Sequence, residues 1–215
     1  MIRPFALIVI ACAALAAMAE APGARRTWDF QGDAVGGPPA GFTLGRTGGG
    51  APAGWVVEVD ASAPAGDHVL SRTGSGDDGF PLAVADAPVL RDVRVEVRCK
   101  PVAGEIDRAC GVVARLKGLD DYYVARANAL EDNVNLYRVV GGRRSELEGW
   151  TGKVTSGAWH TLSLEVRGNV LTVTWDGKQV IEARDDTFPE AGRIGVWTKA
   201  DSVTRFDALT ATELR

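Results

Sequence analysis

The segment YYVARANALEDNVNLYRVV, residues 122–140, decides the fold because its composition suits either one helix or two strands. Its Ala, Leu, Arg and Glu residues favour a helix, whereas the paired tyrosines and the valines favour strands. As a hairpin that turns at EDN, residues 131–133, it would have Tyr123, Ala125 and Ala127 on one small apolar face. The opposite face would then present Arg126, Asn128, Asn135 and Tyr137.

The rest of the chain favours the hairpin. Apolar and polar residues alternate with a period of two from Trp28 onward, and helical periodicity is hard to find. A single helix at residues 122–140 would conflict with this context. The sequence therefore predicts an all-β fold, a sandwich of two antiparallel sheets. The clearest strands are predicted at residues 54–60, 67–72, 92–99, 110–117, 160–168, 169–177, 178–184, 192–199 and 203–214.

Residues 1–19 have the layout of a signal peptide. Arg3 precedes the apolar run FALIVIACAALAAMA, residues 5–19, which ends in a small-x-small cleavage pattern. The run is short for a membrane span, which needs about 20 apolar residues. The alternative is a lipoprotein signal, because VIAC at residues 9–12 resembles a lipobox and would make Cys12 the lipidated residue. The apolar run continues beyond Cys12, which favours the signal peptide.

The remaining chain is predicted to hold an N-terminal extension, residues 20–27, and one domain, residues 28–215. Removal of residues 1–19 takes away Arg3 alone among the charges, so 24 basic residues become 23 against 28 acidic ones, a net charge of −5. A mildly acidic chain gives no electrostatic reason to expect nucleic acid or an anionic membrane as partner. We expect export to the periplasm or the medium.

Cys99 and Cys110 are the cysteines left after the signal peptide, and a pair in an exported protein predicts a disulfide. Alternation in VRVEVRC and CGVVARLK places both cysteines on apolar faces that also include Val112, Ala114 and Leu116. If the two strands form a hairpin, both sulfurs point inward at its closed end. The alternative is a pair of buried thiols.

The polar face of the 122–140 hairpin is the first candidate site. If the preceding strands join the same sheet, the row would be extended by Arg94, Glu96, Arg98 and Arg115. Such a mixture of donors and acceptors suits sugar hydroxyls. The alternative is a solvated outer face with cross-strand ion pairs, which any half-buried sheet can have.

Several familiar active sites are excluded. His68 and His160 are isolated, and no HxxxH or CxxC spacing exists for zinc. There is no phosphate-binding glycine loop and no GxSxG nucleophile motif. EIDRA, residues 105–109, begins like the ExDxE motif of sandwich-fold glycosidases, but Ala109 replaces the second glutamate. Among the tryptophans, Trp197 is the best candidate for stacking on a sugar, on the same side as Lys199.

Five blocks along the chain resemble one family. They are FPLAVAD, the stretch from CGVVARLK to VVGGRR, WHTLSLEVRGNVLTVTWDGK, GRIGVWTKADS and WTKADSVTRFDAL. Together they resemble the 3-keto-disaccharide hydrolase-like domains, secreted bacterial members of the concanavalin A-like lectin/glucanase superfamily. The resemblance implies a jelly roll and hydrolysis of 3-keto-glycosides, and it extends from about Trp28 to Leu214.

That activity would need a base and a cation. A ketone at C3 acidifies the proton on C2, a base removes it, and the C1 group leaves before water adds. Glu131 is the candidate base, and the alternative is that Glu131 and Asp132 form a polar hairpin turn. The partners of the ketone oxygen and hydroxyls would be Arg126, Asn128, Asn135 and Lys199, with Tyr137 and Trp197 as platforms.

Two further hypotheses follow from the sequence. No cofactor is certain, but domains of this superfamily often hold Ca²⁺ through loop oxygens, and Asp201 is a candidate ligand. A turn-capping role for Asp201 is the alternative. The alternative to the hydrolase is a non-catalytic module with the same jelly roll that binds a carbohydrate or another partner.

Overall fold

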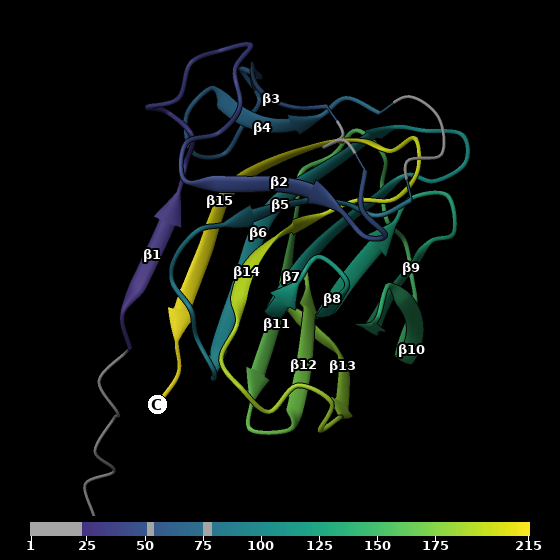
Figure 1. Cartoon of the computed structure of the whole chain (residues 1–215). Coiled ribbons are helices and arrows are strands. Elements are labelled where there is room, and N and C mark those ends of the chain that lie inside the picture. Colours follow the sequence, from purple (N-terminus) through teal and green to yellow (C-terminus); the bar gives the residue numbers. More distant parts are fainter. Residues whose placement is uncertain (1–22, 51–53, 75–78) are drawn as a thin grey trace, which may run out of the picture.

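The computed structural model describes residues 23–50, 54–74 and 79–215. These residues form fifteen β-strands and no helix, so the all-β prediction is confirmed (Figure 1). Within the described ranges no helix is long and apolar enough to cross a membrane. The predicted signal peptide, residues 1–19, lies outside the described residues, as does the lipidation candidate Cys12.

One layer of the sandwich is an eight-stranded antiparallel sheet in the order β13-β12-β11-β6-β15-β4-β3, with β1 paired to β15. Strand β1 begins in the segment predicted as an N-terminal extension, at Arg25, and ends at Trp28. The strands of this sheet are β1 (Arg25–Trp28), β3 (Trp55–Val59), β4 (His68–Arg72), β6 (Val93–Ala103), β11 (His160–Arg167), β12 (Val170–Trp175), β13 (Lys178–Arg184) and β15 (Val203–Glu213).

The other layer is a seven-stranded antiparallel sheet in the order β10-β9-β8-β7-β14-β5-β2. Its strands are β2 (Phe42–Arg46), β5 (Pro81–Ala85), β7 (Ala109–Gly118), β8 (Asp121–Asn128), β9 (Asn133–Val140), β10 (Arg143–Thr151) and β14 (Arg193–Trp197). The hairpin prediction for residues 122–140 is confirmed, because β8 and β9 pair with Arg126 directly opposite Asn135.

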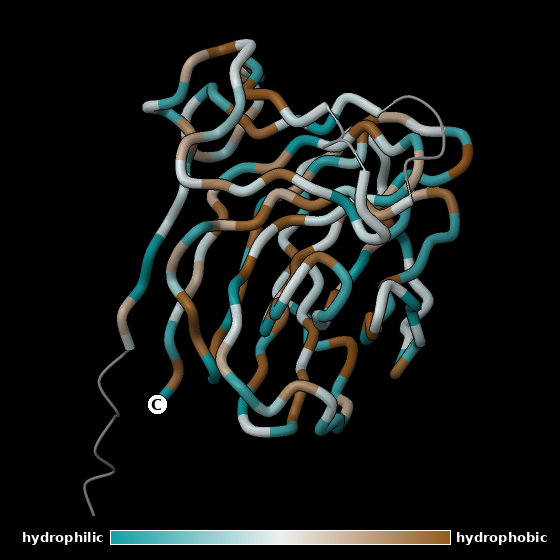
Figure 2. Tube along the Cα trace, in the orientation of Figure 1, coloured by the Kyte–Doolittle hydropathy of each residue, from teal (hydrophilic) through white to brown (hydrophobic). Residues whose placement is uncertain are grey.

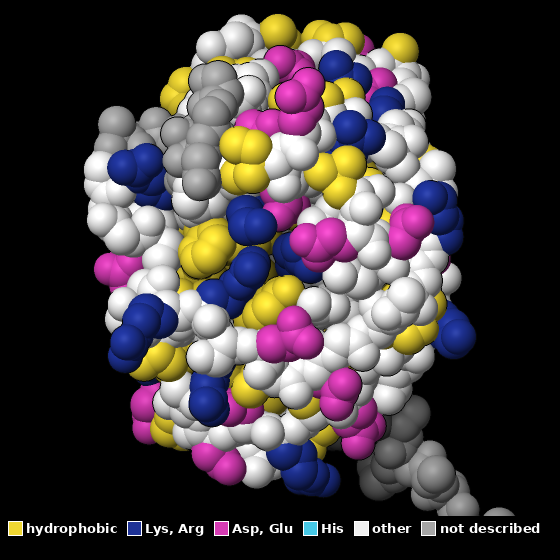
Figure 3. Space-filling model, turned by 90° about the vertical axis from the view of Figure 1, so that its right-hand side faces the viewer, with side chains coloured by type: hydrophobic (Ala, Val, Ile, Leu, Met, Phe, Trp, Pro, Cys, Tyr) yellow, Lys and Arg dark blue, Asp and Glu magenta, His cyan; other side chains and the backbone are white. Residues whose placement is uncertain are grey.

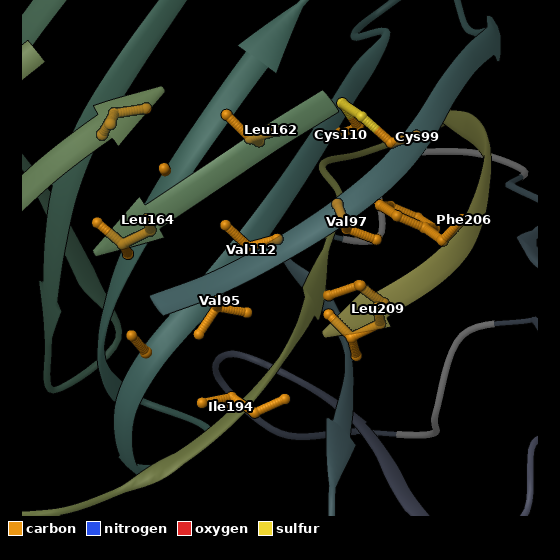
Figure 4. Close-up of a cluster of buried hydrophobic side chains, with 14 of the residues drawn as sticks. Val95, Val97, Cys99, Cys110, Val112, Leu162, Leu164, Ile194, Phe206 and Leu209 are labelled. Atoms are coloured by element: carbon orange, nitrogen blue, oxygen red, sulfur yellow. A yellow bond between two sulfur atoms is a disulfide. The ribbon is translucent and has the colours of Figure 1, made fainter. Parts of the chain in front are cut away.

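The main core lies between the two sheets. Side chains from β6 and β11, such as Val97 and Leu164, face β7 and β14 side chains, such as Val112 and Ile194 (Figure 4). All four are fully buried, and each such aliphatic side chain stabilises the fold by about 1.5–3 kcal/mol. Hydrophobic and hydrophilic segments alternate along the strands (Figure 2), as half-buried sheets require.

The disulfide between Cys99 and Cys110 is confirmed, but the predicted hairpin around it is wrong. Cys99 belongs to β6 in the eight-stranded sheet and Cys110 to β7 in the seven-stranded sheet. The covalent link therefore joins the two layers across the core, and both residues are fully buried. Alternation alone could not distinguish these arrangements, because both point the sulfurs inward.

The predicted polar row is also divided, because β6 and β7 belong to different sheets. Arg94, Glu96 and Arg98 lie on β6, and therefore on the other layer from Arg126. A bulge in β7 displaces the fourth residue, Arg115, whose backbone φ is 49° and whose guanidinium bonds Asp92. Leu116 was predicted to face the main core, but after this bulge it packs on the outer face of the sheet.

Candidate functional site

The outer face of the seven-stranded sheet carries a second, smaller apolar cluster. The indole of Trp197 lies within it and donates a hydrogen bond to the Tyr122 hydroxyl at 3.1 Å. Trp197 is fully buried, so the prediction of an exposed stacking platform is wrong. It faces outward, but Phe80 packs against its ring at 5.3 Å between centroids. Side chains from outside the sheet thus cover this end of the face.

A row of paired positions crosses the sheet beside this cluster. Trp197 lies opposite Gly111, Gly111 opposite Arg126, Arg126 opposite Asn135, and Asn135 opposite Gly149. Gly111 has a packing reason, because a Cβ there would lie 3.1 Å from the Trp197 ring. The two glycines leave the guanidinium and the amide at the centre of the row without bulky cross-strand neighbours.

Arg126 is the centre of the candidate site, and its side chain is only 2% exposed. Its Nη2 donates to Glu131 Oε2 at 2.8 Å and to Asn133 Oδ1 at 2.9 Å. Burial raises the pKa of Glu131, but hydrogen bonds from Arg126 and Asn133 outweigh it, so the pKa lies below its ordinary value. A carboxylate with a lowered pKa is a weaker base than an isolated one.

Asp107 joins Arg126 to the other predicted polar residues. Its fully buried carboxylate forms an ion pair with Lys199 at 2.6 Å and lies 3.9 Å from Arg126 Nη1. It also accepts a hydrogen bond from Asn128 Nδ2 at 3.0 Å. Asn128 Oδ1 in turn accepts the backbone N–H of Leu130, which fixes the start of the β8–β9 turn. One buried carboxylate therefore orients an arginine, a lysine and an asparagine.

Asp201 holds the loop that positions Asp107. Its carboxylate accepts hydrogen bonds from the backbone N–H groups of Glu105, Ile106 and Asp107, the first at 2.7 Å. Burial raises the pKa of Asp201, but these backbone hydrogen bonds lower it below its ordinary value. Both oxygens thus face donors, so the metal-ligand hypothesis for Asp201 gives way to the capping role. No group of three or more metal-binding side chains occurs in residues 23–50, 54–74 and 79–215.

The third part of the face surrounds Tyr137, which is 6% exposed. Asn135 Nδ2 donates to the Tyr137 hydroxyl and to Glu146 Oε2, both at 2.9 Å. The Arg144 guanidinium carbon lies 4.3 Å from the Tyr137 ring centre. Arg144 thus covers the ring, so the aromatic surface predicted for Tyr137 is already occupied by a cation.

The structure therefore brings together Glu131, Arg126, Asn128, Asn135 and Lys199, whereas Arg94, Glu96 and Arg98 of the predicted row lie on the other sheet. Sequence reasoning missed Asp107, Asn133, Glu146 and Arg144 as members. Alternation could have identified Asp107 as an outward residue, because it lies two positions before Ala109 and six before Val113, which both face outward. No sequence pattern identified Arg144 as a site residue, because β10 (Arg143–Thr151) was not predicted as a strand.

Figure 3 views the molecule from the side on which β9 and β10 lie in Figure 1. It shows Lys and Arg side chains gathered in a hollow, with hydrophobic and acidic side chains around them. Donors, acceptors and apolar surface thus meet on one face, which can hydrogen-bond the hydroxyls of a ligand and contact its C–H groups.

Comparison with solved structures places this sandwich among known folds. The carbohydrate-binding module CBM66 from Bacillus subtilis matches with a TM-score of 0.59 at 21% identity, over 74% of this chain and 95% of that one. Lectin II from Ulex europaeus matches with a TM-score of 0.61 at 10% identity, over 90% and 100%. The fold is a lectin-like jelly roll.

The other comparisons do not identify a family for this chain. A protein of unknown function from Shewanella oneidensis, SO2946, has a TM-score of 0.55 at 13% identity, over 90% of this chain and 87% of that one. No protein-family model matches the sequence, and no curated protein matches it. The resemblance to the keto-disaccharide hydrolase-like domains is therefore supported at the level of the jelly-roll fold.

Proposed function

We propose that this chain is an exported carbohydrate-binding protein whose binding face is the outer surface of the seven-stranded sheet around Arg126. The observation that supports this most is the buried network in which Asp107 orients Arg126, Lys199 and Asn128. A polar network fixed in this way presents donors and acceptors without losing much side-chain entropy when a ligand binds. Lectin-like structural neighbours agree with a saccharide as ligand.

The accessible atoms of the face match the chemistry of a sugar. Lys199 is 27% exposed and offers N–H donors, and Glu131 is 48% exposed and offers carboxylate acceptors. A sugar hydroxyl both donates and accepts, so it can bridge such a pair. The disulfide agrees with export, because disulfides persist in the periplasm and outside the cell.

The second candidate is hydrolysis of 3-keto-glycosides, which the sequence resemblance implies. Its support is that the Glu131 carboxylate lies 2.8 Å from a cationic Arg126, a base beside an electrostatic stabiliser. The lowered pKa of Glu131 makes this carboxylate a weak base, and so favours binding over catalysis. Incubation with 3-keto-disaccharides and their unoxidised parents tests this candidate, since release of 3-keto-glucose only from the oxidised forms would support a hydrolase.

Calorimetric titration of residues 20–215 with neutral, oxidised and acidic oligosaccharides tests the binding proposal. Lys199→Met removes an accessible donor on the proposed face, and we expect about tenfold weaker binding of any saccharide that the wild type binds. Lys153→Met is the matched control, because Lys153 is 71% exposed and its ion pair is with the exposed Asp132. Equal affinity of the wild type and Lys199→Met would argue against this face.

A further inference from the structure

Arg144 differs from the other basic residues of the binding face. Its guanidinium carbon lies 4.3 Å from the ring centre of Tyr137, 5.0 Å from that of Phe80 and 5.9 Å from that of Trp197. Within the described part of the chain it forms no ion pair, and its Nη1 is buried without a hydrogen-bond partner. The aromatic rings hold the group in place but leave its charge uncompensated.

A guanidinium without an anion or a hydrogen-bond acceptor lowers the stability of the fold unless a ligand supplies one. A buried N–H donor without an acceptor loses its hydration and gains nothing in return. Two other buried arginines differ from Arg144 in that their charge is paired, since Arg115 pairs with Asp92 at 3.0 Å and Arg126 with Glu131 at 2.8 Å. Because Nη1 itself is buried, an acceptor from outside the chain meets another edge of this partly exposed side chain, which has no ion-pair partner among the described residues.

The carboxylates that share this face are engaged elsewhere. Glu131 is bonded by Arg126, Glu146 accepts from Asn135, and Asp107 is paired with Lys199. A second unmet donor lies close by, because Arg126 Nε is also buried without a partner. The Arg126 guanidinium carbon is 5.7 Å from the same Tyr137 ring that Arg144 covers.

We propose that the binding face takes an acidic saccharide, and that Arg144 receives the carboxylate of a uronic acid residue. This inference rests on the proposed carbohydrate-binding function. A guanidinium whose flat faces contact aromatic rings can still present its N–H edge, and that edge matches the two oxygens of a carboxylate. The neighbouring Lys199 and Glu131, which are 27% and 48% exposed, are available to the ring hydroxyls of the same sugar.

The test is calorimetric titration of residues 20–215 with oligogalacturonate, oligoglucuronate and oligomannuronate, each beside its carboxyl-reduced counterpart. The wild type is expected to bind at least one acidic form about tenfold or more tighter than the reduced form. Arg144→Gln should remove that preference, and Arg144→Lys should restore only part of it, because lysine lacks the fork. Arg143→Gln, an equal charge change at the exposed neighbouring residue, should keep the preference.

The outcomes separate this inference from the function on which it rests. Equal affinity for acidic and reduced forms would overturn the inference and leave carbohydrate binding intact. Failure of every saccharide to bind would overturn both. Tighter binding of a sulfated oligosaccharide than of the matching uronate would also overturn the carboxylate assignment. If Arg144→Gln unfolds, the wild-type comparison and the Arg144→Lys variant still decide the question.

Discussion

Replacement of Asp107 by Asn tests whether one buried carboxylate organises the candidate site. The substitution keeps the shape of the side chain and its acceptor for Asn128, but it removes the charge that faces Lys199 and Arg126. The new amide would also direct N–H donors toward the Lys199 ammonium group. Lys199 would then have lost its ion-pair partner, and Arg126 would keep only Glu131.

The expected loss of stability follows from burial. Loss of one partner from a fully buried pair costs about 3–5 kcal/mol. Lys199 is 27% exposed, and the Arg126 Nη1 contact is long at 3.9 Å, so solvent reduces this figure. We therefore expect about 2–3 kcal/mol, which lowers Tm by about 5–10 °C in a domain of this size.

Urea unfolding and calorimetry of wild type and Asp107→Asn measure this loss, with Asp186→Asn as control. Asp186 is exposed, so the same chemical change there should move Tm by less than about 2 °C. A double-mutant cycle with Lys199→Met should give a favourable coupling of about 1 kcal/mol or more. An Asp107→Asn variant as stable as the wild type would refute the reasoning, because the network would then contribute nothing to folding.

Three further predictions concern the fold. Replacement of Cys99 and Cys110 by Ala should lower the free energy of unfolding by about 3 kcal/mol, because the unfolded chain is no longer constrained, and by more because the core loses both sulfurs. An unchanged urea midpoint would mean that the disulfide does not constrain the unfolded chain. Burial raises the pKa of Asp60, but hydrogen bonds from one serine and two basic side chains bring it below the unfolded value of about 3.9. The ionised Asp60 carboxylate therefore stabilises the fold fully above about pH 5, and this stabilisation is lost as pH falls toward 2. The difference in unfolding free energy between wild type and Asp60→Asn should shrink over that range. A constant difference would contradict the lowered pKa of Asp60. Gly195→Ala should lower Tm markedly because a Cβ there would lie 2.3 Å from the Ala83 carbonyl oxygen, and a Tm equal to that of wild type would show that β5 can move aside.

The sequence predicts the architecture well where alternation is strong. Residues 122–140 form the predicted hairpin, with Tyr123 and Ala125 inward and Arg126 and Asn128 outward. Period two specifies which face a side chain occupies, but it does not specify which sheet a strand joins. For that reason the Cys99–Cys110 link was predicted within a hairpin, whereas it connects the two sheets.

The candidate site was predicted only in part, and the omissions have physical reasons. Alternation indicates that Asp107 faces outward, but no local pattern reveals the long-range contact with Asp201 that fixes its loop. Trp197 faces outward as alternation requires, yet Phe80 and Arg144 cover it. Burial of an outward residue depends on loops and edge strands whose positions alternation does not give.

The most direct test of the account is a backbone-amide NMR titration of residues 20–215 with a saccharide that binds. The account predicts that shift changes concentrate on β8, β9 and β10, with Arg126, Asn135 and Arg144 among the amides most affected. The outer face of the eight-stranded sheet, for example Arg94 and Glu165, should remain unchanged. Shift changes centred on Arg94 and Glu165, with the Arg126 amide unaffected, would contradict the assignment of the binding face.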